Sequence, residues 1–243
     1  MEESDDGQYD YLFDDDDDDD YDKDVGSDSG PQPQADHLLM QLTDLLASTP
    51  HPPPPRTTPP TTIPGFHLYR THLPPTLLAS YTTWLTARYF SSPTSNQAMH
   101  FGPLLDPTTP LGYLARLCRP LRHNPLAFDQ AIVNMYAAGE GIGDHVDLRR
   151  FMDGICGVSF GAPAVMRLAR VMGGGGGGWQ ERYAEEVEGE DAVYVEVRPG
   201  DVYVLEGEAR WKWTHGFPRQ IEGRDNVVGR RISVTLRTLV PDE

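Results

Sequence analysis

The sequence predicts a mainly β fold of the α+β kind, in which helices precede a barrel-like or jelly-roll double sheet. Three observations predict it. Six short segments that alternate or are rich in β-branched residues fall within about 110 residues, turn residues separate them, and the clearest helical pattern lies before them rather than between them. The six segments are residues 131–136, 154–160, 164–171, 192–197, 201–207 and 231–239.

Residues 1–35 are predicted to form a disordered acidic tail. They contain fifteen Asp or Glu residues and one Lys, and so hold −14 of the net charge of −17. Seven successive aspartates repel one another and offer no apolar surface to bury. We expect a solubilising tail, with attraction of a basic partner as the alternative. The remaining residues carry only −3, which leaves a nucleic-acid partner open.

Residues 36–64 are predicted to form a short amphipathic helix and a linker. In ADHLLMQLTDLLAS the leucines recur at helical spacing, and Asp36 is placed to cap the first turn. The helix spans about three turns, too short to be stable alone, so we expect it to dock on the main domain or, alternatively, on a partner. The stretch TPHPPPPRTTPPTTIPG then forms a stiff linker before the domain of residues 65–243.

The domain of residues 65–243 begins with a strand, a helix and loops. GFHLYRTHL predicts a short strand. Residues 74–90 predict a helix with one stripe formed by Leu77, Tyr81, Trp84, Leu85 and Arg88. Residues 91–128 are loop-rich, with a helix near residues 111–118. The glycine run 173–178 predicts a slack hairpin connection, since no P-loop lysine follows it.

Composition excludes several classes of protein. The two cysteines, Cys118 and Cys156, provide neither a disulfide framework nor a Cys-based zinc site. The N-terminus lacks the features of a signal or transit peptide, and no apolar run is long enough to cross a bilayer. We therefore expect a soluble protein of the cytoplasm, the nucleus or both, without a membrane partner.

The stretch GEGIGDHVDL contains the first candidate metal ligands. His145 and Asp147 lie two residues apart after a glycine-rich turn, and in extended backbone their side chains share a face. His215, in RWKWTHGF, is the candidate third ligand. Two His and one carboxylate form the facial triad of non-haem iron oxygenases, but the same set also holds catalytic zinc.

A pair of arginines in RISVTLR distinguishes between these metals. Arg231 and Arg237 are six residues apart, so on one strand both point to the same face, predicted to be the inner one. Two guanidinium groups inside a small barrel are costly unless they meet an anion. A metal-chelating dicarboxylate such as 2-oxoglutarate would satisfy them, and Asn134 and Tyr136 could hydrogen-bond it from a neighbouring strand.

The domain of roughly residues 65–243 resembles the AlkB-like iron(II)/2-oxoglutarate-dependent dioxygenases. The resemblance is carried by three motifs that occur in the family's order: NMYAAGEGIGDHVD, WTHG and RRISVTLR. The resemblance implies a double-stranded β-helix (jelly roll) with Fe(II) on His145, Asp147 and His215, and with 2-oxoglutarate and O2 as cosubstrates. It implies that Arg231, with Asn134 and Tyr136, binds the distal carboxylate of 2-oxoglutarate. Arg237 would contact Asp147 or the proximal carboxylate. Ser233 departs from the pattern, because nucleic-acid repair members often carry Asn there.

The substrate is the least determined part of the resemblance. GEARWKWTHG and the Arg-x-Ser pattern look more like the branch that hydroxylates modified wobble uridine in tRNA. We therefore expect demethylation or hydroxylation of a modified tRNA or DNA base. The alternatives are a protein substrate and a non-catalytic binding module on the same fold. Arg149 would contact phosphates, unless it is a solvated loop residue, and Trp211 and Trp213 would stack on a base, unless they fill the core.

Overall fold

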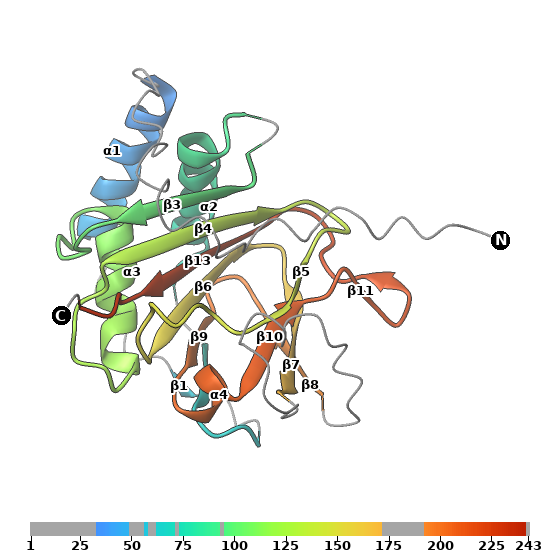
Figure 1. Cartoon of the computed structure of the whole chain (residues 1–243). Helices are drawn as coiled ribbons and strands as arrows, with labels where there is room; N and C mark the ends of the chain where they lie inside the picture. Colours follow the sequence, from blue (N-terminus) through green and yellow to red (C-terminus); the bar gives the residue numbers. More distant parts are fainter. Residues whose placement is uncertain are drawn as a thin grey trace, which may run out of the picture. The chain divides into compact units, whose positions relative to one another are not determined.

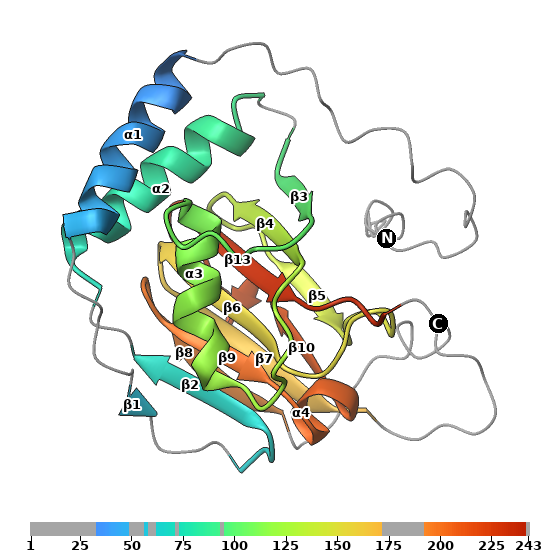
Figure 2. The same cartoon turned by 90° about the vertical axis from the view of Figure 1, so that its left-hand side faces the viewer.

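Two larger antiparallel β-sheets, with three helices on one of them, form the main body of the computed structural model (Figures 1 and 2). It describes residues 33–48, 56–57, 62–70, 73–92, 95–171 and 192–241. A compact unit begins at Pro33. The predicted acidic tail up to Gln32, most of the proline-rich linker and the glycine run 173–178 lie outside the described residues.

The major sheet has the strand order β1-β2-β9-β6-β13-β4-β3. Its strands are β1 (Arg56–Thr57), β2 (Phe66–Arg70), β3 (Gln97–Phe101), β4 (Gln130–Tyr136), β6 (Ile155–Gly161), β9 (Val202–Leu205) and β13 (Arg231–Arg237). β13 lies between β4 and β6 and pairs with both along nearly its whole length.

The minor sheet has the order β5-β10-β7-β8. Its strands are β5 (Ile142–His145), β7 (Ala164–Arg170), β8 (Val193–Val197) and β10 (Trp213–Phe217). A short helix, α4 (Glu208–Trp211), leads from the major sheet into β10. The hairpin β11 (Gln220–Ile221) and β12 (Arg224–Asp225) projects from the chain between β10 and β13 (Figure 1).

The outer face of the major sheet is covered by α1 (Pro33–Ser48), α2 (Pro75–Tyr89) and α3 (Pro110–Cys118), and a 3-10 turn, η1 (Arg119–Leu121), follows α3. Leu42 and Leu46 of α1 are buried in one core together with residues of α2 and the strands. A helix this short is not stable alone, so this packing stabilises it. Residues on alternate positions of the strands complete this core, for example Val133 and Val234.

A second apolar cluster lies between the two sheets and contains Phe66, Tyr203, Met166, Leu168 and Phe217. On β13 the residues that face this space are polar instead: Arg231, Ser233, Thr235 and Arg237, all buried. The opposite residues of β4 on the same face include Asn134 and Tyr136. The inner face is thus apolar at one side of the barrel and polar at the other.

The predicted mainly β double sheet with N-terminal helices is confirmed, and so are all six predicted strands and the helices near residues 74–90 and 111–118. Two expectations were wrong in detail. Residues 91–128 contain the edge strand β3, which has no β-branched residue to reveal it. α1 begins at Pro33, so that Asp36 lies inside its first turn and does not cap it. Among the described residues, no helix is long and apolar enough to cross a membrane.

Candidate active site

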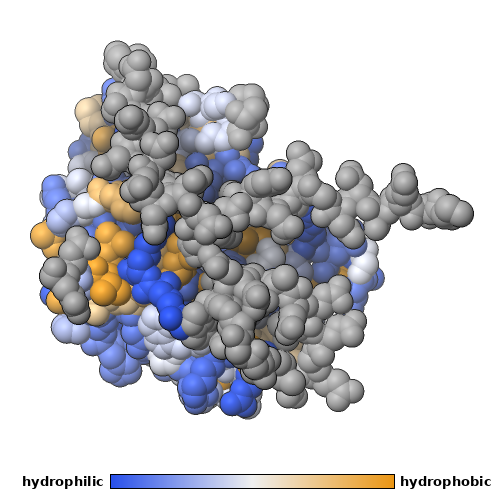
Figure 3. Space-filling model, in the orientation of Figure 1, coloured by the Kyte–Doolittle hydropathy of each residue, from blue (hydrophilic) through white to orange (hydrophobic). Residues whose placement is uncertain are grey.

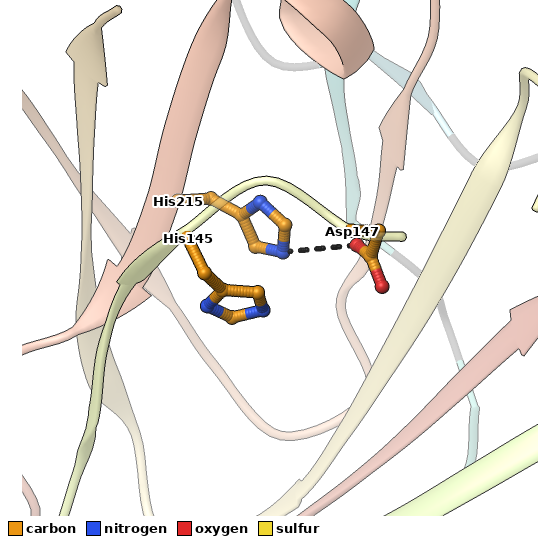
Figure 4. A group of neighbouring side chains, drawn as sticks. All are labelled: His145, Asp147 and His215. Atoms are coloured by element: carbon orange, nitrogen blue, oxygen red, sulfur yellow. Dashed lines mark ion pairs between the residues drawn. The ribbon is translucent and has the colours of Figure 1, made fainter. Parts of the chain in front are cut away.

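His145, Asp147 and His215 converge between the sheets (Figure 4). One candidate ligand atom of each lies within 4.8 Å of the others. The Nε2 atom of His215 lies 3.4 Å from Oδ2 of Asp147, and the two imidazole rings have their centres 4.4 Å apart. His145 is half-buried, whereas Asp147 and His215 are buried, so the group is accessible from the side of His145.

The pairing of β5 with β10 brings the two histidines together. His145, the last residue of β5, lies opposite His215 of β10. Gly141, just before β5, allows this close approach, because a Cβ atom there would lie 2.1 Å from the carbonyl oxygen of Phe217. Asp147 lies two residues beyond the end of the strand, in the loop that follows it. The loop still turns its carboxylate towards both imidazoles.

The carboxylate of Asp147 is held by Arg237. Nη1 of Arg237 donates to Oδ1 at 2.7 Å, and Nε of Arg237 donates to Oε1 of the fully buried Gln130 at 2.8 Å. Burial by itself would raise the pKa of Asp147, but Arg237, followed by His215 and His145, lowers it well below its usual range. Oδ2 makes no hydrogen bond with the described residues and remains available as an anionic ligand.

Both histidines offer a ring nitrogen to a cation. Burial, followed by the neighbouring His145, lowers the pKa of His215 to about 3. Nδ1 of His145 lies 2.9 Å from the carbonyl oxygen of Gly143, which assigns the proton to that nitrogen and leaves the lone pair on Nε2. With an anionic carboxylate, this donor set fits Fe(II) or another first-row divalent ion.

Arg231 is fully buried, and none of its three side-chain nitrogens has a hydrogen-bond acceptor in proper geometry among the described residues. Its guanidinium lies 3.7 Å from the ring centre of Phe217 and 5.3 Å from that of Tyr136. Tyr136 favours the charged form, but burial still lowers the pKa of Arg231 below its ordinary value. A buried cation without a partner is costly, so the site fits a carboxylate ligand such as 2-oxoglutarate.

Polar groups surround Arg231 on the inner face. Ser233 lies opposite Asn134 in the register of β13 and β4, and the side chain of Asn134 accepts a hydrogen bond from Gln97 at 2.9 Å. Tyr203 of β9 reaches over Gly157, where a Cβ atom would lie 2.0 Å from the tyrosine ring. Burial raises the pKa of Tyr203 to about 12, so its hydroxyl remains a donor.

The three residues expected near the substrate have different environments. Arg149 is exposed, two residues after Asp147. Trp211 is half-buried, and its ring centre lies 4.0 Å from the guanidinium carbon of Arg210. Trp213, two residues before His215 on β10, packs against the apolar cluster between the sheets.

Sequence reasoning missed Gln130, Tyr203 and Arg210. Gln130 and Tyr203 were open to prediction, because Gln130 shares the alternation of Asn134 and Tyr136, and Tyr203 occupies an inner position of the predicted strand 201–207. Arg210 gave no local signal, since its contacts lie about sixty residues earlier in the chain.

Comparison with known proteins agrees with this geometry. The profile of the 2OG-Fe(II) oxygenase superfamily matches residues 69–237, most of the chain and every residue of the site. The chain therefore belongs to the 2OG-Fe(II) oxygenase superfamily. This confirms the expected family at the level of a superfamily that is named for Fe(II) and 2-oxoglutarate, and the donor set of His145, Asp147 and His215 fits that metal.

Three curated proteins show the similarity in sequence. An uncharacterised protein, L905, of Acanthamoeba polyphaga mimivirus is 27% identical over 47% of this chain and 50% of its own. The alkylated DNA repair protein ALKBH8 homolog of Arabidopsis thaliana is 30% identical over 46% of this chain and 34% of its own. The tRNA (carboxymethyluridine(34)-5-O)-methyltransferase alkbh8 of Xenopus tropicalis is 31% identical over 42% of this chain and 13% of its own. The matches thus span half or less of these relatives.

Two solved structures are similar at a lower level. OsALKBH1 is 14% identical, with a TM-score of 0.38, over 84% of this chain and 92% of its own. HygX from Streptomyces hygroscopicus, with nickel and 2-oxoglutarate bound, is 15% identical, with a TM-score of 0.46, over 71% of this chain and 81% of its own.

Proposed function

We propose that this dioxygenase oxidises a modified base in tRNA or DNA, by hydroxylation or by oxidative demethylation. The observation that carries the chemistry is the buried, unsatisfied guanidinium of Arg231 on the same inner face as Arg237, which holds Asp147 beside His145 and His215. In this proposal His145, Asp147 and His215 hold the metal. Arg231, Asn134, Tyr136 and Ser233 bind a carboxylate of 2-oxoglutarate.

The chain's residues have separate tasks in this reaction. When bound, Fe(II) and 2-oxoglutarate supply with O2 the oxidising power that inserts one oxygen atom into a C–H bond, and 2-oxoglutarate leaves as succinate and CO2. Arg237 fixes the orientation of the Asp147 carboxylate and keeps it ionised. The apolar cluster between the sheets, including Phe217 beside Arg231, excludes water from the carboxylate site.

The names of two relatives support a nucleic-acid substrate, since one is called an alkylated DNA repair protein homolog and the other a tRNA methyltransferase.

The surface next to the site also supports a nucleic-acid substrate. Met99 and Phe101 of β3 are 43% and 48% exposed and lie opposite Ile132 and Gln130, which face the barrel interior. Figure 3 shows apolar surface where β3 ends and β4 begins. An exposed Phe beside the site offers a flat surface for a base.

The test measures succinate formation by wild-type protein supplied with Fe(II), 2-oxoglutarate and O2. Oligonucleotides with methylated or wobble-modified bases, and a protein extract, serve as separate substrate sets. We expect succinate formation to rise with one nucleic-acid set and to be lost in the double variant His145→Ala, Asp147→Ala. Mass spectrometry of the nucleosides identifies the product.

Succinate formation that responds only to the protein extract would overturn the nucleic-acid substrate but keep the oxygenase. Wild-type protein that binds neither metal nor 2-oxoglutarate would overturn both. The same nucleoside measurement in cells that lack the protein gives an independent check, because a genuine substrate base should accumulate there.

A further inference from the structure

Arg210 is a fully buried arginine that contacts the loop beginning at Asp147, a candidate metal ligand. It belongs to the single-turn helix α4 and is 2% exposed. Its Nη1 donates to the carbonyl oxygen of Asp147 at 3.0 Å, and its Nη2 donates to those of Leu148 at 2.7 Å and Phe151 at 3.0 Å. One guanidinium therefore binds three backbone carbonyls of the turn that begins at a candidate metal ligand.

The same helix and the same loop are joined a second time. The backbone N–H of Gly207, at the start of α4, donates to the carboxylate of Asp153 at 2.9 Å. After α4 the chain enters β10, which carries His215 five residues beyond Arg210. The loop of residues 147–153 and the segment that leads to the distal histidine are thus tied together at two points, one of them directly at Asp147.

From these contacts we infer that Arg210 is a positioning residue, which fixes the backbone of Asp147 relative to His215 and so sets the geometry of the metal site. The inference rests on the proposed metal-binding role of these two residues. Arg210 acts through Asp147 and does not touch the metal itself. Residues that orient metal ligands in this way commonly change metal affinity about 10- to 100-fold when they are replaced.

An arginine is required here because of the shape of its donor group. The planar guanidinium directs several N–H groups at separate acceptors at once, whereas a lysine ammonium is a point charge at the end of a flexible chain. The Trp211 ring, 4.0 Å from the guanidinium carbon, fixes the plane of the group. Lysine would keep the charge and the length at Arg210, but it could not hold three carbonyls in one orientation.

Arg122 provides a matched control. It is also buried, at 7% exposure, and it also binds loop acceptors: the Gly154 carbonyl at 3.3 Å, the Thr238 hydroxyl at 2.9 Å and the Leu126 carbonyl. Its guanidinium carbon lies 3.6 Å from the ring centre of Phe128. None of these acceptors belongs to residues 147–151, so Arg122→Lys tests the general cost of losing a buried, stacked arginine.

The experiment compares the full-length variants Arg210→Lys, Arg210→Gln and Arg122→Lys with wild type. In the metal-free proteins, amide hydrogen exchange of residues 147–152 is measured. In the loaded proteins, Co(II) is titrated, and its visible absorption spectrum reports both affinity and ligand geometry. We expect both Arg210 variants to exchange faster in this loop, to bind Co(II) about 10- to 100-fold more weakly and to change the Co(II) spectrum. Arg122→Lys should keep the Co(II) affinity and spectrum of wild type.

A folded Arg210→Lys protein with unchanged Co(II) affinity and spectrum would overturn the inference. So would an equal loss of affinity in Arg122→Lys, or a failure of both Arg210 variants to fold while Arg122→Lys folds, because Arg210 would then serve the fold as a whole. Failure of the proposed function has different results: wild-type protein would bind Co(II) normally and oxidise no nucleic acid, or wild-type protein itself would bind no Co(II). The exchange measurement needs neither metal nor substrate.

Discussion

Arg231 is expected to favour the binding of 2-oxoglutarate and to lower the stability of the free protein. Its guanidinium is fully buried and makes no hydrogen bond in proper geometry with the described residues, so in the free protein the rings of Phe217 and Tyr136 offset only part of its desolvation. A bound carboxylate would offset more of that cost. Arg231 should therefore lower the free energy of unfolding of the free protein and raise that of the complex with 2-oxoglutarate.

The replacement Arg231→Met is expected to raise the unfolding temperature of the free protein or leave it unchanged. The same replacement should weaken 2-oxoglutarate binding by more than about thirtyfold, since losing one partner of a buried charged pair costs about 2–5 kcal/mol. Thermal unfolding and calorimetric titration with Mn(II) present check the two effects. The neighbouring Arg230, which is exposed, gives the control Arg230→Met. A marked loss of stability in the free Arg231→Met protein would contradict the prediction.

His215 should make the metal-free protein sensitive to mild acid. Burial, followed by His145, lowers its pKa from the ordinary 6.5 to about 3, so between these values the unfolded chain binds a proton that the folded chain does not. The free energy of unfolding must then fall as the pH falls through this window. The contribution reaches up to about 2 kcal/mol between pH 6.5 and 5.

Urea unfolding from pH 7.5 to 5, with a chelator present, measures this effect. His215→Gln should lose less stability on acidification than wild type does, whereas His100→Gln, at an exposed position, should lose as much as wild type. Equal losses in all three proteins would show that other groups cause the pH dependence. The window stays above the range in which Asp147 titrates, because the pKa of Asp147 is itself lowered.

The sequence predicts buried charged residues of the site only where they lie on a regular strand. The even spacing of Arg231 and Arg237 predicts that both point inward, and the structure places both there, because β13 is paired on each side and alternates without a bulge. Arg210 could not be predicted. Its role depends on a loop about sixty residues away, which only the tertiary structure brings near.

At the scale of elements, the paired strands of the major sheet were predictable and the strands next to the metal site were less so. The six predicted strands are rich in β-branched residues or alternate clearly. β5 has only four residues, and one of them is a glycine; β10 contains both Gly216 and His215. Their extended form comes from pairing with each other and with β7 rather than from propensity.

Gly157 of β6 is expected to be sensitive to a single added methyl group. A Cβ atom there would lie 2.0 Å from the ring of Tyr203, so Gly157→Ala must displace that ring from the inner face near Arg231. We expect a loss of about 1–3 kcal/mol in the free energy of unfolding, as for other overpacked cores. Urea unfolding gives the magnitude.

Gly143→Ala is the matched control, because Gly143 also lies in a strand but a Cβ atom there has no neighbour within 4 Å. That variant should differ from wild type by less than about 0.5 kcal/mol. A Gly157→Ala protein as stable as the control would mean that Tyr203 moves away at no cost, and that the inner face of β6 is less closely packed than its geometry indicates.

At the scale of the whole molecule, the site joins the two sheets. His145 and His215 belong to the minor sheet, Asp147 to the loop after β5, and Arg231 and Arg237 to β13 of the major sheet. The ion pair between Arg237 and Asp147 connects the two parts of the site, and so does the contact of Arg231 with Phe217. A metal held by His145, Asp147 and His215 and a dicarboxylate held by Arg231 would add a further connection.

Metal and 2-oxoglutarate should therefore stabilise the protein cooperatively. Without O2, Mn(II) alone and 2-oxoglutarate alone should each raise the unfolding temperature less than half as much as both together, because a metal held by His145, Asp147 and His215 would be an additional partner for a dicarboxylate held by Arg231. A ligand at a hundred times its Kd adds about 2.7 kcal/mol to the free energy of unfolding. In His145→Ala, whose side chain is half-buried in wild type, the added effect of the pair should disappear. Additive shifts in wild type would mean that metal and 2-oxoglutarate bind independently and that the sheets are not linked through them.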